Sequence, residues 1–303
     1  MQHYWLLLSL MTLKQLEKYF IAEIQFLYDD EEARQLFYLT VDHVSGLSRN
    51  QVMIHADLEP DEKQQASFQQ VLAELKEGRP LQHIFGEAWF YGLKFKVSSA
   101  VLIPRPETEE LVQWIIETAA GTAGVSLIDI GTGSGCIAVT LKNKLAGLQV
   151  DALDISADAL NIARENAIRN AVEVNFIQAD ILGYEGLARY DFIVSNPPYI
   201  TQEERSEMHR NVLSHEPHLA LFVSDENPLI FYKSIADFAL KQLRHAGYLF
   251  FEINEYLGKE MVDMLSAKGF TDIQLKKDMQ GKDRMIRCRL SLTPGMEPGN
   301  NAL

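Results

Sequence analysis

Helical and strand patterns alternate from residue 108 onward, and this alternation constrains the possible fold more than any other feature of the sequence. Apolar residues recur at helical spacing in 108–119, 134–146, 157–170, 228–245 and 257–268. Apolar runs typical of buried strands lie at 125–130, 149–153, 174–179, in the segment ending at Ser195, and at 247–253. Parallel strands need a crossover, and a helix in that crossover packs on the sheet. We therefore predict an α/β fold with a mostly parallel sheet covered on both faces. An antiparallel pair, 271–277 and 284–291, is expected at its edge.

The first 80 residues differ from the rest because they contain helical patterns only, as in 12–28, 30–45 and 61–77. We predict a small, acidic, all-helical domain over 1–80, with substrate recognition as its expected role. Residues 81–107 have alternating apolar positions and read as a β-hairpin linker. The sheet domain then covers 108–292, and the Pro-, Gly- and Asn-rich segment 293–303 is expected to be disordered.

Composition limits the possible partners and compartment. The formal net charge is −14 and the sequence pI is near 5.0, which argues against a broad nucleic-acid-binding surface. Cys136 and Cys288 lie far apart in sequence, so neither a disulfide framework nor a metal site is expected. The apolar start has no basic n-region or small-residue cleavage site, and no apolar run is long enough to cross a bilayer. We expect a cytoplasmic monomer without membrane or nucleic-acid partners.

A glycine-rich loop follows the first predicted strand of the sheet, in "LIDIGTGSGC". Gly131, Gly133 and Gly135 permit a tight turn and a close approach of the backbone to a ligand. A dinucleotide fingerprint needs a glycine where this chain has Cys136, and a Walker loop needs a Lys-Ser/Thr ending that is missing. The loop alone is a weak signal. Together with acids at the ends of the next two strands, the loop, including Thr132 and Ser134, is a candidate for binding a nucleoside without a pyrophosphate.

Two carboxylates stand at the ends of the next two predicted strands, in "VDALD" and "FIQAD". Asp154 is placed to accept hydrogen bonds from both hydroxyls of a ribose. Asp180 is placed beside an adenine ring. The alternative for each acid is a helix N-cap or a solvated strand end.

The fourth predicted strand runs into Asn196-Pro197-Pro198-Tyr199, a stiff corner that cannot continue a central strand. Its rigidity suits the preorganisation of two hydrogen-bond acceptors, the Asn196 side-chain oxygen and the Pro197 carbonyl oxygen. Two such acceptors can hold the N–H groups of a planar, conjugated nitrogen and raise its reactivity. Tyr199 offers a flat apolar face for the same planar group. No metal is needed for such a transfer.

The glycine loop, the two acids and the Asn-Pro-Pro-Tyr corner together resemble the class I S-adenosylmethionine-dependent methyltransferases, which have a Rossmann-like sheet. Four further stretches resemble the release factor glutamine methyltransferase family: "PLQHIFGEAWFYG", "VLIPRPETEELV", "VSNPPYI" and "EPHLALF". This resemblance covers about residues 12–290. It implies methyl transfer from S-adenosyl-L-methionine, with S-adenosyl-L-homocysteine as product, to the side-chain amide of the glutamine in the Gly-Gly-Gln loop of bacterial peptide chain release factors.

Carried over residue by residue, the resemblance assigns donor binding and substrate binding to separate stretches. It implies that Gly131 to Gly135, Asp154, Asp180 and Asn196 bind the donor, and that Asn196, Pro197, Pro198 and Tyr199 hold the glutamine, with Asn196, Pro197 and Tyr199 catalytic. Ile181 follows Asp180 where some relatives have an aromatic residue, which puts the contact to adenine in question.

Other readings remain open from the sequence. A glutamine methyltransferase acting on a ribosomal protein shares the same corner, and so do N6-adenine DNA methyltransferases. The DNA reading fits a net charge of −14 poorly. A protein that binds the donor without catalysis is the alternative from another class. Glu252, inside the apolar run "LFFEIN", receives no role from the sequence.

Overall fold

The computed structural model describes residues 11–122, 124–201, 203–207 and 215–290. The chain separates into two compact units, with a boundary between Gly86 and Glu87. The expectations for residues 1–10 and for the tail 293–303 lie outside the described residues. No helix in the described part of the chain has the length and apolar character needed to span a membrane.

The first unit is built from helices: α2 (Leu13–Ile24), α3 (Asp30–Ser45), α4 (Arg49–Ile54), α5 (Glu62–Lys76) and α6 (Leu81–Phe85). Side chains at the N-caps fix where the helices begin. Asp29 accepts hydrogen bonds from two backbone N–H groups of α3, and Asp61 forms a capping box with Gln64 at the start of α5. The core is apolar and contains three buried aromatic rings: Phe37 meets Phe20 edge to face and stacks on Phe68. The predicted all-helical character of the N-terminal region is confirmed.

The β-hairpin in the structure is shorter than the segment 81–107 for which it was predicted. Residues 81–85 form helix α6, so the prediction of hairpin structure from residue 81 is wrong for this segment. The helix forms because Leu81 packs into the core of the first unit, and Gly86 ends it with φ of 68°. The hairpin itself is β1 (Glu87–Phe90) paired with β2 (Leu93–Lys96).

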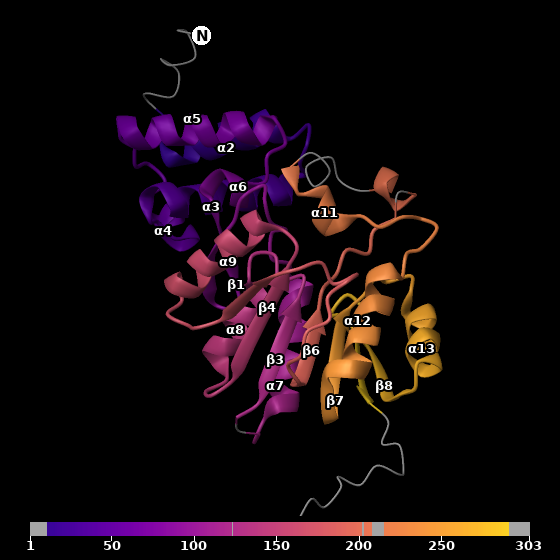
Figure 1. The fold of residues 1–303 in the computed structure, drawn as a ribbon. Coiled ribbons are helices and arrows are strands. Elements are labelled where there is room, and N and C mark those ends of the chain that lie inside the picture. The colour runs from indigo at the N-terminus through magenta and orange to yellow at the C-terminus, as the bar shows by residue number, and fades with distance from the viewer. Residues whose placement is uncertain (1–10, 123, 202, 208–214, 291–303) are drawn as a thin grey trace, which may run out of the picture. The chain divides into compact units, whose positions relative to one another are not determined.

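The second unit contains the predicted α/β sheet. Its strands are β3 (Ser126–Ile130), β4 (Gln149–Asp154), β5 (Asn175–Gln178), β6 (Tyr190–Ser195), β7 (Leu243–Glu252), β8 (Phe270–Lys277) and β9 (Asp283–Leu290). They lie in the order β5-β4-β3-β6-β7-β9-β8, much of which can be followed in Figure 1. The pairs from β5 to β7 are parallel, whereas β9 is antiparallel to both its neighbours. The predicted fold class is therefore confirmed.

Alternate residues of the central strands face opposite layers of helices. Leu127, Val194 and Phe250 pack in a core with α7 (Pro106–Ala119) and α8 (Cys136–Lys144). Their neighbours Ile128, Ile193 and Phe251 pack in a second core with α12 (Ile230–Gln242) and α13 (Gly258–Ala267). Figure 1 shows α12 and α13 on the same side of the sheet. Helix α9 (Ala157–Arg169) follows β4 and contacts β2, β4 and β5.

The boundary between α12 and β7 differs from the sequence prediction. The helix predicted over 228–245 ends at Gln242, and strand β7 begins at Leu243 rather than at residue 247. Leu243 and Tyr190 are both buried and pair across the sheet, just before a shift in the register between β6 and β7. This long-range pairing overrides the helical spacing, which by itself runs on to residue 245.

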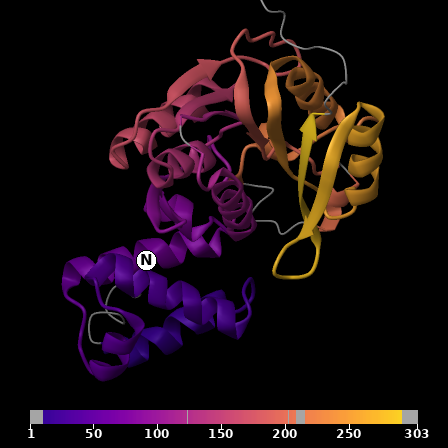
Figure 2. The ribbon, with the colours of Figure 1, turned by 90° about the horizontal axis from the view of Figure 1, so that it is seen from below.

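The last two strands close the sheet as a hairpin, drawn in yellow in Figure 2. Because β9 lies between β7 and β8, the final described strand is an internal strand of the sheet. Its residue Met285 pairs with Glu252 at the end of β7. This pairing places the last strand directly behind the site described below.

Candidate active site

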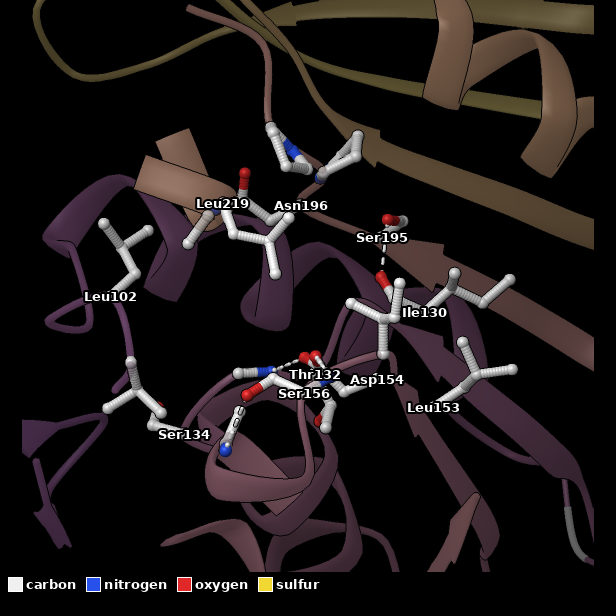
Figure 3. Close-up of a pocket in the computed structure, with 18 of the residues that line it drawn as sticks. Leu102, Ile130, Thr132, Ser134, Leu153, Asp154, Ser156, Ser195, Asn196 and Leu219 are labelled. Atoms are coloured by element: carbon white, nitrogen blue, oxygen red, sulfur yellow. Dashed lines mark hydrogen bonds between the residues drawn. The ribbon is translucent and has the colours of Figure 1, made fainter. Parts of the chain in front are cut away.

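A cavity of about 300 Å³ opens in the second unit at the carboxyl ends of β3, β4 and β6. This is the edge at which open parallel sheets bind ligands. Figure 3 shows Asn196 and Leu219 on one side of the cavity, and Thr132, Asp154 and Ser156 on the opposite side. Residues from the glycine loop, the two strand-end acids, the Asn-Pro-Pro-Tyr corner and the "VLIPRPETEELV" stretch line it, including the following: Arg105, Thr108, Gly131, Thr132, Gly133, Ser134, Asp154, Asp180, Asn196, Pro197 and Pro198.

The glycine loop leaves open space in front of its backbone. Gly131 and Gly133 have φ of 76° and 55°, and no atom lies within 4 Å of the position that a Cβ would take on either residue. The loop is tied to the next strand, because the Gly133 N–H donates to Asp154 Oδ2 at 2.8 Å. On its other side, Asn166 Nδ2 donates to the Ser134 carbonyl oxygen at 2.9 Å. The backbone is thus held in place while its open face is available to a ligand.

Gly135 has a different role, because it packs closely against α9. Its φ is 79°, and a Cβ there would lie 3.0 Å from Ala163 Cβ and 3.3 Å from Ala163 Cα. We expect Gly135→Ala to lower the unfolding free energy by about 2–4 kcal/mol, since it adds a close contact to a left-handed backbone. Thermal melting would then shift down by about 5–12 °C.

Gly147→Ala is the matched control for this change. Gly147 has the same φ of 79°, but no atom lies within 4 Å of its Cβ position. Gly147→Ala should therefore lower the unfolding free energy by about 1–2 kcal/mol, which is the cost of a left-handed backbone for alanine without any close contact. Equal melting temperatures for the two variants would contradict the proposed contact with Ala163.

The two predicted acids both reach the cavity, in different surroundings. Asp154 is partly buried; besides Gly133, it accepts a hydrogen bond from the Ser156 N–H at 2.9 Å. Burial raises the pKa of this carboxyl above its usual range, and the backbone hydrogen bonds oppose that shift. Asp180 is exposed at the cavity rim, where its Oδ1 accepts from the Leu182 N–H at 2.9 Å. Both side chains keep acceptor capacity for a ligand hydroxyl or amine.

The Asn-Pro-Pro-Tyr corner is anchored at both ends. Before it, Ser195 Oγ donates to the Ile130 carbonyl oxygen at 2.6 Å, which ties the end of β6 to the end of β3. After it, Ile200 pairs with Phe222 in a parallel bridge. This bridge positions the segment that includes α11 (His218–Leu221), whose Leu219 lines the cavity. Asn196, Pro197 and Pro198 are thereby presented at the cavity wall by a fixed backbone.

A hydrogen-bond network centred on the buried residues Thr108 and Glu252 supports this wall. Asn196 Nδ2 donates to Thr108 Oγ1 at 3.3 Å, and Thr108 Oγ1 donates to Glu252 Oε2 at 2.7 Å. The other carboxylate oxygen, Glu252 Oε1, accepts from the Tyr199 hydroxyl at 3.3 Å. Burial raises the pKa of Glu252 to about 6, despite the hydrogen bond from Thr108 and the nearby charge of Arg284. The network connects α7, β6 and β7 at the corner.

Tyr199 is therefore placed differently from its three neighbours. Among the described residues, those that line the cavity include Asn196, Pro197 and Pro198 but not Tyr199. Burial, together with the charge of Glu252, raises the pKa of the Tyr199 hydroxyl above its usual range, so this group acts as a hydrogen-bond donor. The expectation that its ring packs on a planar substrate group stays a prediction.

Sequence reasoning missed Thr108 and Asp129 and assigned no role to Glu252. Asp129 is fully buried, and Thr132 Oγ1 donates to its Oδ2 at 2.6 Å, so the acid fixes the first turn of the glycine loop. Burial raises the pKa of Asp129 to about 7. The available signal was an acid inside an apolar strand, in "SLIDI" and again in "LFFEI". Thr108 offered no such signal.

Comparison with known proteins decides the family. A family model described as methyltransferase small domain matches residues 108–220, and one described as PrmC N-terminal domain matches residues 21–86. The release factor glutamine methyltransferase of Flavobacterium psychrophilum is 44% identical over 281 residues, which cover 91% of this chain and 99% of the relative. The chain belongs to the release factor glutamine methyltransferase family. The Bacteroides thetaiotaomicron member is 41% identical over 270 residues, covering 88% and 96% of the two chains.

Membership of the release factor glutamine methyltransferase family makes this chain a methyltransferase. A solved structure of the hMettl16 catalytic domain matches with a TM-score of 0.53 at 17% identity, covering 76% of this chain and 83% of that one. At that identity the likeness concerns the fold alone. Within the described residues, His, Cys, Asp and Glu side chains form no group of three or more that could hold a metal ion.

Proposed function

We propose that this chain transfers a methyl group from S-adenosyl-L-methionine to the side-chain amide nitrogen of the glutamine in the Gly-Gly-Gln loop of bacterial peptide chain release factors. The observation that carries the proposal is the position of Asn196. It lies in the wall of the cavity that also contains the glycine loop, and its amide is held by Thr108. A relative that is 44% identical over 99% of its own length bears the name of this activity.

The residues of the cavity fit the proposed donor. The open space before Gly131 and Gly133 can admit the amino acid part of the donor close to the backbone. Asp154 supplies acceptors for the ribose hydroxyls, and Asp180, at the rim, lies where an adenine amine can be met. When bound, S-adenosyl-L-methionine supplies an electrophilic methyl group on a sulfonium and leaves as S-adenosyl-L-homocysteine.

The corner is proposed to act on the substrate amide. Its nitrogen is a weak nucleophile because its lone pair is delocalised into the carbonyl group. The Asn196 Oδ1 and the Pro197 carbonyl oxygen can each accept one N–H of that amide, which aligns the lone pair with the methyl group. Both acceptors are fixed before the substrate arrives. In the transition state the amide nitrogen gains positive charge and its N–H groups become more acidic, so the two acceptors bind them more strongly and stabilise the transition state. After methyl transfer, the positively charged amide nitrogen loses one proton to water, which leaves the neutral N-methylated amide.

Methyl transfer from labelled donor tests this proposal directly. The acceptors to compare are whole release factor, its Gln→Ala loop variant, ribosomal proteins and duplex DNA. Label on the release factor, with loss of label in the loop variant, is the expected result. Label on a ribosomal protein or on DNA instead would overturn the proposed substrate but keep the proposed chemistry.

We further propose that the helical N-terminal region, residues 1–80 with the short helix α6 that completes its core, contacts the release factor outside the methylated loop. The match of residues 21–86 to the PrmC N-terminal domain and the separate apolar core of this unit support a distinct role. The net charge of −14 supports action without nucleic-acid partners. The proposed active state is a cytoplasmic monomer.

Deletion of residues 1–86 is expected to lower kcat/KM on whole release factor by at least about tenfold, because the remote contacts contribute binding energy. Donor binding and activity on a short peptide containing the Gly-Gly-Gln sequence should stay within about twofold, since neither uses the deleted contacts. Circular dichroism must first show that the shortened chain is folded. An unchanged kcat/KM on whole release factor would contradict this role.

A further inference from the structure

The buried network behind the catalytic corner contains a directional constraint. A neutral threonine hydroxyl has one proton to donate, whereas an ionised carboxylate can only accept. The 2.7 Å contact between Thr108 Oγ1 and Glu252 Oε2 therefore uses the proton of Thr108. The hydroxyl oxygen then has only lone pairs to offer to Asn196.

This constraint determines which end of the Asn196 amide faces Thr108. An amide group has an NH₂ end and an oxygen end of nearly the same shape, so packing alone does not select between them. Against an oxygen that can only accept, the NH₂ end is favoured, and Asn196 Nδ2 lies 3.3 Å from Thr108 Oγ1. The opposite end, Oδ1, is left to the cavity that Asn196 lines.

We infer that Glu252 and Thr108 act as positioning residues, in which the Glu252 carboxylate fixes the direction of the Thr108 hydroxyl and Thr108 fixes the Asn196 amide with its oxygen toward the cavity. This inference rests on the proposed function, in which that oxygen accepts an N–H of the substrate amide. With the amide reversed, an NH₂ group would meet the substrate NH₂ group, and the site would repel what it has to hold. Donation toward Thr108 also polarises the Asn196 amide and strengthens its oxygen as an acceptor.

The surroundings of Glu252 support a fixed carboxylate. Its side chain is 2% exposed, and the Tyr232 hydroxyl donates to its backbone oxygen at 3.2 Å. The charged or titratable groups that interact electrostatically with Glu252 include the following: Glu107 on α7, Cys136 on α8, Tyr199 after β6, Tyr232 on α12 and Arg284 on β9. Of these, Glu107 raises the pKa of Glu252, whereas Arg284 and Tyr199 lower it. Burial dominates and raises this pKa to about 6.

The hydrogen bonds from Asn196 to Thr108 and from Thr108 to Glu252 form a relay, and protonation of Glu252 is expected to reverse their direction. A protonated carboxyl can donate to Thr108 Oγ1, and the hydroxyl of Thr108 is then free to donate to the oxygen of Asn196. The active orientation is thus present above the pKa of Glu252 and lost as the pH falls through it. At saturating donor and release factor, kcat should fall about fourfold between pH 8 and pH 5.5, following the ionised fraction of one group.

Three variants separate this role from simple structural support. Thr108→Val keeps the shape but removes the hydroxyl, and it should lower kcat about tenfold to hundredfold with the Kd for donor within about twofold. Thr108→Ser restores the hydroxyl and should return kcat to within about threefold of the wild type. Glu252→Gln carries no charge at any pH, so its kcat should be about tenfold lower at pH 8 and independent of pH down to 5.5.

Thr140→Val is the matched control. Thr140 is fully buried in α8, and its hydroxyl has no hydrogen-bond partner in the described part of the chain. This variant makes the same chemical change in the same unit and should leave kcat within about twofold. Wild-type kcat in Thr108→Val, or an unaltered pH profile in Glu252→Gln, would overturn the inference.

A spectroscopic measurement keeps the inference distinct from the proposed function. The ¹⁵N signal of the Asn196 side-chain amide, assigned by its loss in Asn196→Ala, should shift with an apparent pKa near that of Glu252 in the wild type and stay constant in Glu252→Gln. This measurement needs no substrate. If release factor is not methylated but the signal titrates as expected, the proposed substrate fails and the relay stands. If methylation occurs and the signal does not titrate, only the relay fails.

Discussion

Replacing Asn196 with alanine is expected to lower kcat/KM for methyl transfer by about 10²–10³-fold or more. The variant removes a fixed acceptor at the position where the substrate N–H groups become acidic, and loss of one preorganised hydrogen bond at such a position typically has an effect of this size. Donor affinity should fall by less than about tenfold, because Asn196 is only one of the expected donor contacts and the glycine loop and Asp154 lie on the other side of the cavity. Methyl transfer kinetics and donor titration on the same preparation measure the two effects.

Two further changes make the Asn196 result interpretable. Asn161→Ala removes an exposed asparagine of α9 and should leave the kinetics unchanged. Asn196→Asp keeps the size of the side chain but replaces the NH₂ group that donates to Thr108 Oγ1 with a carboxylate oxygen, which can only accept. This variant should therefore be nearly as inactive as the alanine variant. Normal turnover by Asn196→Ala would show that the corner does not bind the reacting amide, and the proposed mechanism would have to be abandoned.

Asp154→Ala is expected to weaken donor binding about hundredfold. The carboxylate holds the Gly133 and Ser156 N–H groups at 2.8 and 2.9 Å, and in the proposed complex it also accepts the ribose hydroxyls. A hundredfold change in affinity corresponds to about 2.7 kcal/mol, and hydrogen bonds to a charged acceptor contribute about 1.5–3 kcal/mol each, so the expected effect equals the net loss of one to two such bonds. Isothermal titration with S-adenosyl-L-homocysteine measures the affinity without turnover.

Asp158→Ala provides the comparison for this change. Asp158 is an exposed acid in the first turn of α9, close to Asp154 in sequence. Its replacement should leave donor affinity within about twofold. If Asp154→Ala binds S-adenosyl-L-homocysteine as tightly as the Asp158 variant does, the ribose assignment is wrong and the acid is only an anchor for the glycine loop.

The sequence was sufficient to predict the candidate residues that stand at strand ends. In a parallel sheet, the carboxyl ends of neighbouring strands meet at one edge, so Asp154 and Asn196 could be placed near the glycine loop from their order along the chain. The cavity they line follows from that topology. Their roles in binding and catalysis remain predictions.

The residues that sequence reasoning missed depend on contacts between distant segments. Thr108 and Glu252 are 144 positions apart, and nothing in the local pattern around either residue indicates the other. Leu243 shows the same limit at the level of secondary structure, because its pairing with Tyr190 replaces the helix that its neighbours favour. Local patterns predict elements and strand ends, whereas partnerships across the fold require the packed structure.

Strand β9 is synthesised after the other strands but lies inside the sheet, so the chain cannot become active until this strand has been made. A chain emerging from the ribosome can form β3 to β7 and the glycine loop before residues 283–290 exist, but Glu252 then lacks its neighbour Met285 and faces an open sheet edge. A nascent or truncated chain that stops before Asp283 can therefore hold much of the donor site while its catalytic corner is unsupported. Competence for methyl transfer should arise late, when the last strand of the described structure inserts between two that are already made.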